Sequence, residues 1–226
     1  MKKTPASTAQ TEPLAGKSTA ANYHLKVVLS GTEPPIWRRL QVPANARLDW
    51  LHAVIQVAMG WTNSHLHQFR TETADYSANT KSPFDDGGES RTLDAKRFTL
   101  AQLASHEGEV FCYEYDFGDT WEHLLTVEKI LPADPATATA ALCLDGARAC
   151  PPEDCGGPWG YEDLLTALNN PKHPEHENMV EWLGRPFDAA AFEVAKTNKW
   201  LAKLKWPRVT EAQLRTVLMA RDGYRK

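Results

Sequence analysis

The chain has 226 residues, of which 42% are hydrophobic and 24% charged, and its net charge is −4. This composition is typical of a globular protein with one large domain, or one and a half. The absence of any run of about 18 apolar residues excludes a transmembrane helix, and the N-terminus lacks the apolar stretch of a signal peptide, so we expect a cytoplasmic protein with no membrane partner.

The first part of the chain predicts strands around one clear helix. Residues 1–21 are rich in Thr, Ala, Ser and Pro without periodicity, which predicts a disordered tail. Alternating apolar residues predict strands over 23–29 and 36–42, paired as a hairpin. Residues 47–59 carry apolar side chains at the i, i+3, i+4, i+7 spacing of an amphipathic helix.

The middle of the chain predicts three more strands. In chain order we expect a strand, a long surface loop, a short helix and two strands, over residues 64–70, 72–95, 98–103, 110–116 and 121–131. Gly118-Asp119 stands where a tight hairpin turn between the last two strands requires it. A linker of small residues, 132–141, follows.

The stretch 143–161 divides the chain. It holds three of the four cysteines together with several prolines and glycines, and it predicts neither an ordinary helix nor a strand. After it the pattern predicts helices only, over residues 161–168, 173–183, 188–204 and 210–218.

This order of elements predicts an α+β domain over residues 22–204. One mixed or antiparallel sheet should pack against helices, and a helical C-terminal part should follow. Residues 205–226 then form a basic helical extension. Residues 196–226 hold nine Lys and Arg residues and two acidic ones, which makes this end a candidate for weak contact with nucleic acid. The alternative is a solvated helix face.

Two sets of residues have the chemistry of a zinc site. The first is Cys143, Cys150 and Cys155, with a fourth ligand taken from His173, His176 or Asp154. The cysteine spacing differs from the usual pair of close knuckles. The alternative is cysteines that are free or packed in a proline-rich loop.

The second set is His65, His67 and His123. Residues i and i+2 of a strand project from one face, so His65 and His67 should point together, and His123 on a nearby strand can join them. Three histidines with an open fourth position make a catalytic type of zinc site, whose rings Asp116 and Asp119 would orient. The alternative is histidines of the core or its rim.

The turn before residue 121 is also a candidate ligand surface. Asp116, Asp119 and Trp121 place carboxylates beside an aromatic ring, and Trp159 lies in the cysteine-rich stretch. The alternative is that each aspartate caps its own turn and that Trp159 packs at the junction of the two halves. No nucleophile elbow, phosphate-binding loop or dinucleotide fingerprint occurs, so no catalytic residue is assigned.

Five motifs occur together and in order: Pro35-Ile-Trp-Arg-Arg, His65-Leu-His-Gln-Phe, Tyr115-Asp-Phe-Gly-Asp-Thr-Trp-Glu-His123, Ala149-Cys-Pro-Pro-Glu-Asp-Cys-Gly-Gly-Pro-Trp-Gly-Tyr161 and His173-Pro-Glu-His-Glu177. As a set they resemble the plasmid pRiA ORF-three-like family, over residues 22–195. The resemblance implies an α/β-roll-like α+β domain of bacterial, plasmid or mobile-element origin. Some members are labelled putative transposon resolvases, but the serine and arginines that a serine recombinase needs in its N-terminal motif are not found here.

The function that we expect is a non-enzymatic binding or accessory module. The first alternative is a zinc-dependent hydrolase that uses the histidine cluster. The second is a nucleic-acid accessory factor that acts through the basic C-terminus. Zinc is the one cofactor that the residues suggest, and the sequence names no substrate.

Overall fold

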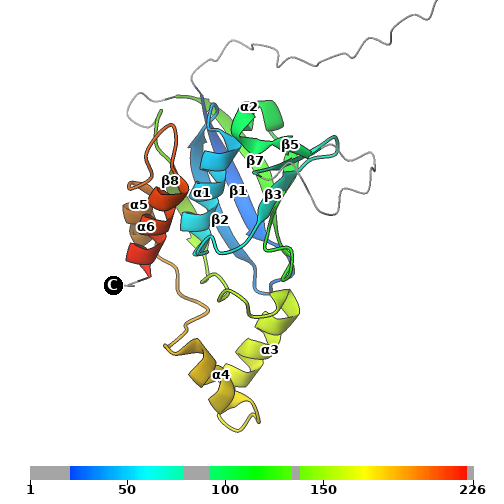
Figure 1. Ribbon diagram of the computed structural model, residues 1–226, viewed down its shortest axis with the longest axis vertical. Coiled ribbons are helices and arrows are strands. Elements are labelled where there is room, and N and C mark those ends of the chain that lie inside the picture. The colour runs from blue at the N-terminus through cyan, green and yellow to red at the C-terminus, as the bar shows by residue number, and fades with distance from the viewer. Residues whose placement is uncertain (1–20, 79–91, 134–137, 223–226) are drawn as a thin grey trace, which may run out of the picture.

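The computed structural model describes residues 21–78, 92–133 and 138–222, which form an eight-stranded mixed sheet and its covering helices (Figure 1). The strand order is β5-β4-β3-β6-β7-β1-β2-β8. The strands are β1 (Ala21–Leu29), β2 (Ile36–Pro43), β3 (His67–Arg70), β4 (Asp75–Ser77), β5 (Thr92–Asp94), β6 (Val110–Tyr115), β7 (Trp121–Pro132) and β8 (Leu142–Ala147). The helices are α1 (Leu48–Met59), the short 3₁₀ helix η1 (Ala95–Arg97), α2 (Leu100–Leu103), α3 (Gly157–Asn169), α4 (His176–Leu183), α5 (Val194–Leu201) and α6 (Glu211–Arg221).

The centre of the sheet follows from the period-two alternation in β1. Leu25, Val27 and Leu29 are buried on one face, and β1 pairs antiparallel with β2 on one side and with β7 on the other. In Figure 1 α1 lies across the sheet, with α5 and α6 beside it. Every residue of α1 except Asp49 is buried, because neighbouring elements cover the sides of the helix that the sheet does not.

Two arginines close the C-terminal end of α1. Arg38 of β2 is 1% exposed and donates to the carbonyls of Ala58 and Met59 at 2.8 and 3.2 Å. Arg221, at the end of α6, donates to the carbonyls of Gln56, Gly60 and Trp61. The last carbonyls of a helix have no partner within the helix and carry its negative dipole end, so two guanidinium groups stabilise this end. One of the basic residues of 196–226 therefore has a structural use.

The helices α3 and α4 project together beyond one end of the sheet (Figure 1). The side chain of His176 joins them, since its Nδ1 donates to the carbonyl of Ala167 at 2.9 Å. Among the helices that the structure describes, none is long and apolar enough to span a membrane.

The α+β class, with one mixed sheet, is confirmed. The hairpin of 23–29 with 36–42, the helix 47–59 and the hairpin of 110–116 with 121–131 also match the observed elements. Local periodicity is enough to predict these elements, because each is long enough to show a clear period. The strands of both hairpins are also neighbours in the chain. The expected tail falls almost wholly on residues 1–20, outside the described chain.

Three expectations about elements are wrong. The surface loop 72–95 contains β4 and β5, which are three residues each and too short to show periodicity. The stretch 143–161 contains most of β8 and the start of α3, where Pro158 occupies the first helical turn that proline favours. The helix expected from residue 188 begins only at Val194.

Candidate metal centre

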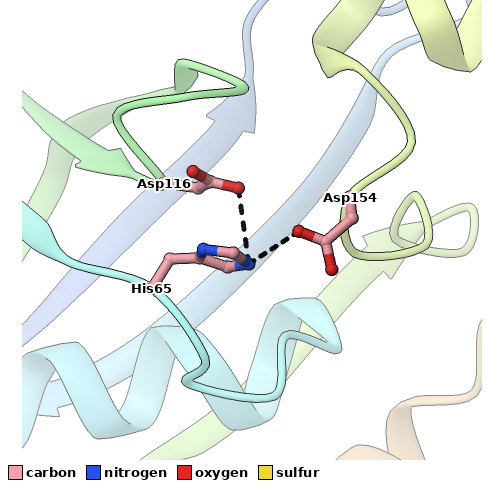
Figure 2. A group of neighbouring side chains, drawn as sticks. All are labelled: His65, Asp116 and Asp154. Carbon is pink, nitrogen blue, oxygen red and sulfur yellow. Dashed lines mark ion pairs between the residues drawn. The ribbon is translucent and has the colours of Figure 1, made fainter.

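Three side chains from distant parts of the chain converge beside the end of β6 (Figure 2). His65 precedes β3, Asp116 follows β6, and Asp154 lies in the loop before α3. The Nε2 atom of His65 is 3.0 Å from Asp154 Oδ1 and 3.5 Å from Asp116 Oδ2. One ligand atom from each residue lies within 4.8 Å of the others, which is close enough for the three groups to share a metal ion.

Glu153 adds a fourth side chain, and a third carboxylate, to this group. Its Oε1 accepts hydrogen bonds from Thr62 N at 2.6 Å, Thr62 Oγ1 at 2.8 Å and Tyr115 Oη at 3.0 Å. These donors fix the carboxylate and leave Oε2 buried, 3.8 Å from His65 Nε2. Neither Glu153 Oε2 nor His65 Nε2 has a hydrogen-bond partner within the described chain. Two buried polar atoms without a hydrogen bond therefore lie 3.8 Å apart at the centre of the group.

The backbone is unusual at both aspartates. Asp116 and Asp154 each have φ of +57°, in the left-handed region that non-glycine residues seldom adopt. Asp116 Oδ1 accepts from the N–H of Gly118 at 3.0 Å, which leaves Oδ2 for His65. The expectation that Asp116 caps its own turn is thus correct for one oxygen, while the other contributes to the centre.

Asp119 connects the β6–β7 hairpin to the loop that carries Asp154. Its Oδ2 accepts from the N–H of Gly156, just before α3, at 3.1 Å. At the next residue, Gly157, the backbone lies against the carbonyl group of Asp119, since a Cβ added to Gly157 would lie only 2.5 Å from that carbonyl oxygen. Asp119 therefore positions the Asp154 loop and does not itself join the centre.

Replacing Gly157 by alanine should destabilise the protein by about 2–4 kcal/mol, from the left-handed backbone and the collision with Asp119 together. The matched control is Gly108→Ala, since Gly108 has φ of +85° but no atom within 4 Å of an added Cβ. It should cost only about 1 kcal/mol. Urea unfolding followed by circular dichroism measures both, and equal losses would show that the contact at Gly157 contributes nothing.

The structure does not bring His65, His67 and His123 to one site. His123 is 0% exposed and neutral: its Nδ1 donates to the carbonyl of Trp121 at 3.0 Å, and its Nε2 accepts from Trp61 Nε1 at 3.1 Å. His67 stacks face to face on His52, with ring centroids 3.5 Å apart. Burial lowers the pKa of His52 and of His123 to about 4 and also lowers that of His67 well below its usual value. His52 and His123 are therefore buried in the core, and His67 is half-buried at its rim, as the alternative interpretation held.

The three cysteines of the cysteine-rich stretch are not gathered either. No group of three potential metal ligands among the described residues includes a cysteine. Cys143 is buried on β8, Cys150 packs against Gly60 after α1, and Cys155 precedes α3. Burial raises the pKa of Cys143 to about 11 and that of Cys155 to about 12, and raises that of Cys150 as well. The three thiols therefore do not meet at one point, as a shared zinc ion would require.

The two tryptophans predicted to bind ligand have opposite environments. Trp121 is 0% exposed and packs against Trp61, with ring centroids 5.3 Å apart, so it cannot meet a ligand at the surface. Trp159 is 81% exposed on the first turn of α3 and is not the buried packing anchor of the alternative interpretation. Glu153 was not singled out in the sequence. Its position beside Asp154 was the available signal, but adjacent acids are common on surfaces.

A family model described as plasmid pRiA4b ORF-3-like protein matches residues 21–196. The chain belongs to this family. A relative in it, the uncharacterized protein y4hQ of Sinorhizobium fredii (strain NBRC 101917 / NGR234), is 40% identical over 193 residues, which are 84% of this chain and 96% of the relative. The resemblance of the five motifs is thereby confirmed, and the motifs at His65, Asp116 and Asp154 lie within the matched range.

A solved structure of the same architecture is similar over most of the chain. It is a protein of unknown function, MM3350 from Methanosarcina mazei Go1, with a TM-score of 0.68 and 35% identity over 79% of this chain and 98% of that one. Both relatives are described as uncharacterized or of unknown function. The comparisons therefore establish family and fold, and the function has to be argued from the site.

Proposed function

We propose that the protein is a binding module whose centre holds one divalent transition-metal ion. His65, Asp116 and Asp154 are the ligands, and Glu153 is the fourth donor. The observation that carries this proposal is the buried Nε2 of His65, which lacks a hydrogen-bond partner in the described chain and faces oxygens of all three carboxylates. One imidazole nitrogen with carboxylate oxygens suits Zn²⁺, Mn²⁺ or Fe²⁺ better than Ca²⁺ or Cu⁺.

Charge supports the same proposal. Carboxylates gathered around one point repel one another unless a cation neutralises them. A protonated His65 supplies one positive charge against three carboxylates, whereas a divalent ion supplies two and replaces the missing hydrogen bonds with coordination bonds. The side chains of Asp116 and Glu153 are 9% and 16% exposed, and that of Asp154 is 69% exposed. The ion would therefore be reached from the side of Asp154.

Such an ion would also hold three segments together. It would link the loop after α1, the end of β6 and the loop before α3, which are the segments that carry His65, Asp116 and Asp154. Metal binding would then stabilise the position of α3 and α4 relative to the sheet, since anything that binds only the folded state adds to its stability.

Metal titration tests the proposal. Protein purified without a histidine tag, stripped with a chelator and titrated with Zn²⁺ and Mn²⁺ against a chromophoric competitor should bind about one equivalent of one of them. His65→Ala and Asp154→Asn should each weaken metal binding by at least about tenfold, because even residues that only hydrogen-bond to a metal ligand contribute that much to affinity. His106→Ala is the matched control, since His106 pairs with Glu109 on the surface, outside the centre.

The result that would contradict the proposal is equally defined. Binding below about 0.2 equivalents for both ions, or the same affinity in the wild-type protein and in His65→Ala, excludes this centre as a metal site. Asp154→Asn keeps the shape of the side chain, so a loss of affinity there cannot be assigned to misfolding if its circular dichroism and unfolding curve match those of the wild-type protein.

A further inference from the structure

A cavity of about 620 Å³ lies between α3 and α4, outside the core of the sheet. Its volume is within the range of small-molecule sites in proteins. One wall is a single face of α3, formed by residues at i, i+3, i+4 and i+7: Gly160, Asp163, Leu164 and Ala167. The facing wall is made by Glu175, Met179 and Trp182, which again follow helical spacing. Two helix faces therefore meet around a space that their side chains do not fill.

Backbone contacts fix the α3 wall of this space. Gly160 allows the carbonyl of Cys155 to lie directly against the helix, because a Cβ there would lie 2.0 Å from this oxygen. Ala167 contributes one methyl group at the other end of the same helix face. The hydrogen bond from His176 to the carbonyl of Ala167 ties the second helix to the first. These contacts hold the two helices around the cavity.

The lining combines carboxylates with apolar side chains. Asp154, Asp163 and Glu175 supply three carboxylates, and the lining contains no Lys or Arg, its one imidazole being that of His173. The apolar part is formed by Leu164, which is 2% exposed, together with Met179 and the indole of Trp182, which is 48% exposed. An anion would meet three like charges here. A neutral apolar molecule would leave the carboxylates without a counter-charge.

We propose that this cavity binds a small organic cation, an alkylammonium or alkylguanidinium group with a hydrocarbon body. The carboxylates of Asp163 and Glu175 face the charged group, and the ring of Trp182 provides the surface over which cations are attracted. The hydrocarbon part packs on Leu164 and Met179. The cavity shares Asp154 with the proposed metal centre, but it needs no metal, because Asp163, Glu175 and Trp182 belong to the cavity alone.

Binding of three six-carbon probes tests this proposal. Hexylammonium, hexan-1-ol and hexanoate have similar bodies and differ in charge, and their binding to the full chain is measured by calorimetry in a buffer that contains a metal chelator. Hexylammonium should bind at least about tenfold more tightly than the other two, and its affinity should fall as salt is added, because salt screens exposed charges.

Two pairs of variants locate the probe. Asp163→Asn should weaken hexylammonium binding up to about fivefold, as expected for one exposed ion pair, whereas Glu162→Gln, next to it on α3 but outside the lining, should not. Trp182→Ala should weaken binding between about threefold and thirtyfold. Trp159→Ala removes another exposed tryptophan of the α3–α4 pair, one outside the lining, and should leave the affinity unchanged.

Equal affinity for hexylammonium and hexan-1-ol would overturn the proposal, as would wild-type affinity in both Asp163→Asn and Trp182→Ala. The result is separate from that for the metal centre, since chelator is present throughout and the variants at Asp163 and Trp182 change residues that belong to the cavity alone. Failure of the metal titration therefore leaves this proposal standing, and failure here leaves the metal centre standing.

Discussion

Replacing Arg38 by methionine should destabilise the protein by roughly 3–5 kcal/mol, one of the two largest effects that we expect. The guanidinium donates to the carbonyls of Trp37, Ala58, Met59 and Ala147, and it stacks on the ring of Phe192, 3.9 Å from its centroid. A methionine fills the volume but leaves these carbonyls without donors, and a buried polar group left unpaired costs about 1–3 kcal/mol. Urea unfolding measures the loss.

Arg39→Met is the control for this substitution. Arg39 is the next residue on β2, points to the other face of the sheet and pairs with Glu128 at 2.6 Å, with a third of its side chain exposed. Such a surface pair contributes about 1 kcal/mol or less. Arg38→Lys should also lose stability, because an ammonium cannot reproduce the planar fork of donors. Losses within about 1 kcal/mol of each other for Arg38→Met and Arg39→Met would contradict this account.

Stability should fall strongly between about pH 6.5 and pH 5, and this is the second large effect. Burial is the main reason that the pKa values of His52 and His123 are lowered to about 4 and that of His67 is also lowered. In the unfolded chain these residues titrate near pH 6.5. Below that pH the unfolded state binds more protons than the folded state, so the stabilisation present above pH 6.5 is lost as the pH falls towards 4. The loss by pH 5 is about 2 kcal/mol each for His52 and His123.

The comparison of unfolding free energies at about pH 7.5 and pH 5 checks this prediction. His123→Gln should reduce the difference between the two pH values, whatever it does to stability at either one. His106→Gln should change the difference less than His123→Gln does, because the side chain of His106 is 73% exposed whereas His123 is 0% exposed. Carboxylates that are paired in the folded state lose their contribution mainly below about pH 4.5, outside this window. Equal stability at both pH values would refute the prediction.

Periodicity in the sequence was sufficient for the elements whose partners are close in the chain. The hairpin of β1 and β2, the helix α1 and the hairpin of β6 and β7 are of this kind, and each shows a clear period of two or of 3.6. The strands β4 and β5 were not predicted, because a strand of three residues is too short to show a period in its apolar residues. The strand β8 was not predicted because its Asp145 and Gly146 are poor strand formers, and pairing with β2 stabilises the strand despite them.

The candidate site shows the same division. Residue type marked His65 and Asp116 as candidates in the sequence. His65 was predicted to be one of three histidine ligands of zinc, and Asp116 was predicted to orient those rings or to form part of a ligand surface. Which ring nitrogen meets which carboxylate depends on long-range packing. The stacking of His67 on His52 and the hydrogen bonds of His123 remove two of the expected ligands, and the loop before α3 supplies Glu153 and Asp154 in their place.

The sequence by itself determined the α+β class, the family and the central elements, because alternation, helical spacing and five ordered motifs are properties of local stretches of chain. Only the tertiary structure decided which polar groups meet. Burial lowers the pKa of His52, His67 and His123 and raises that of the cysteines. The backbone at Asp116 and Asp154 is left-handed, and their carboxylates lie beside His65. Neither burial nor the direction of a side chain follows from residue type, because both depend on groups that are far apart in the chain. His65, Asp116 and Asp154 are separated from one another by 38 to 89 residues.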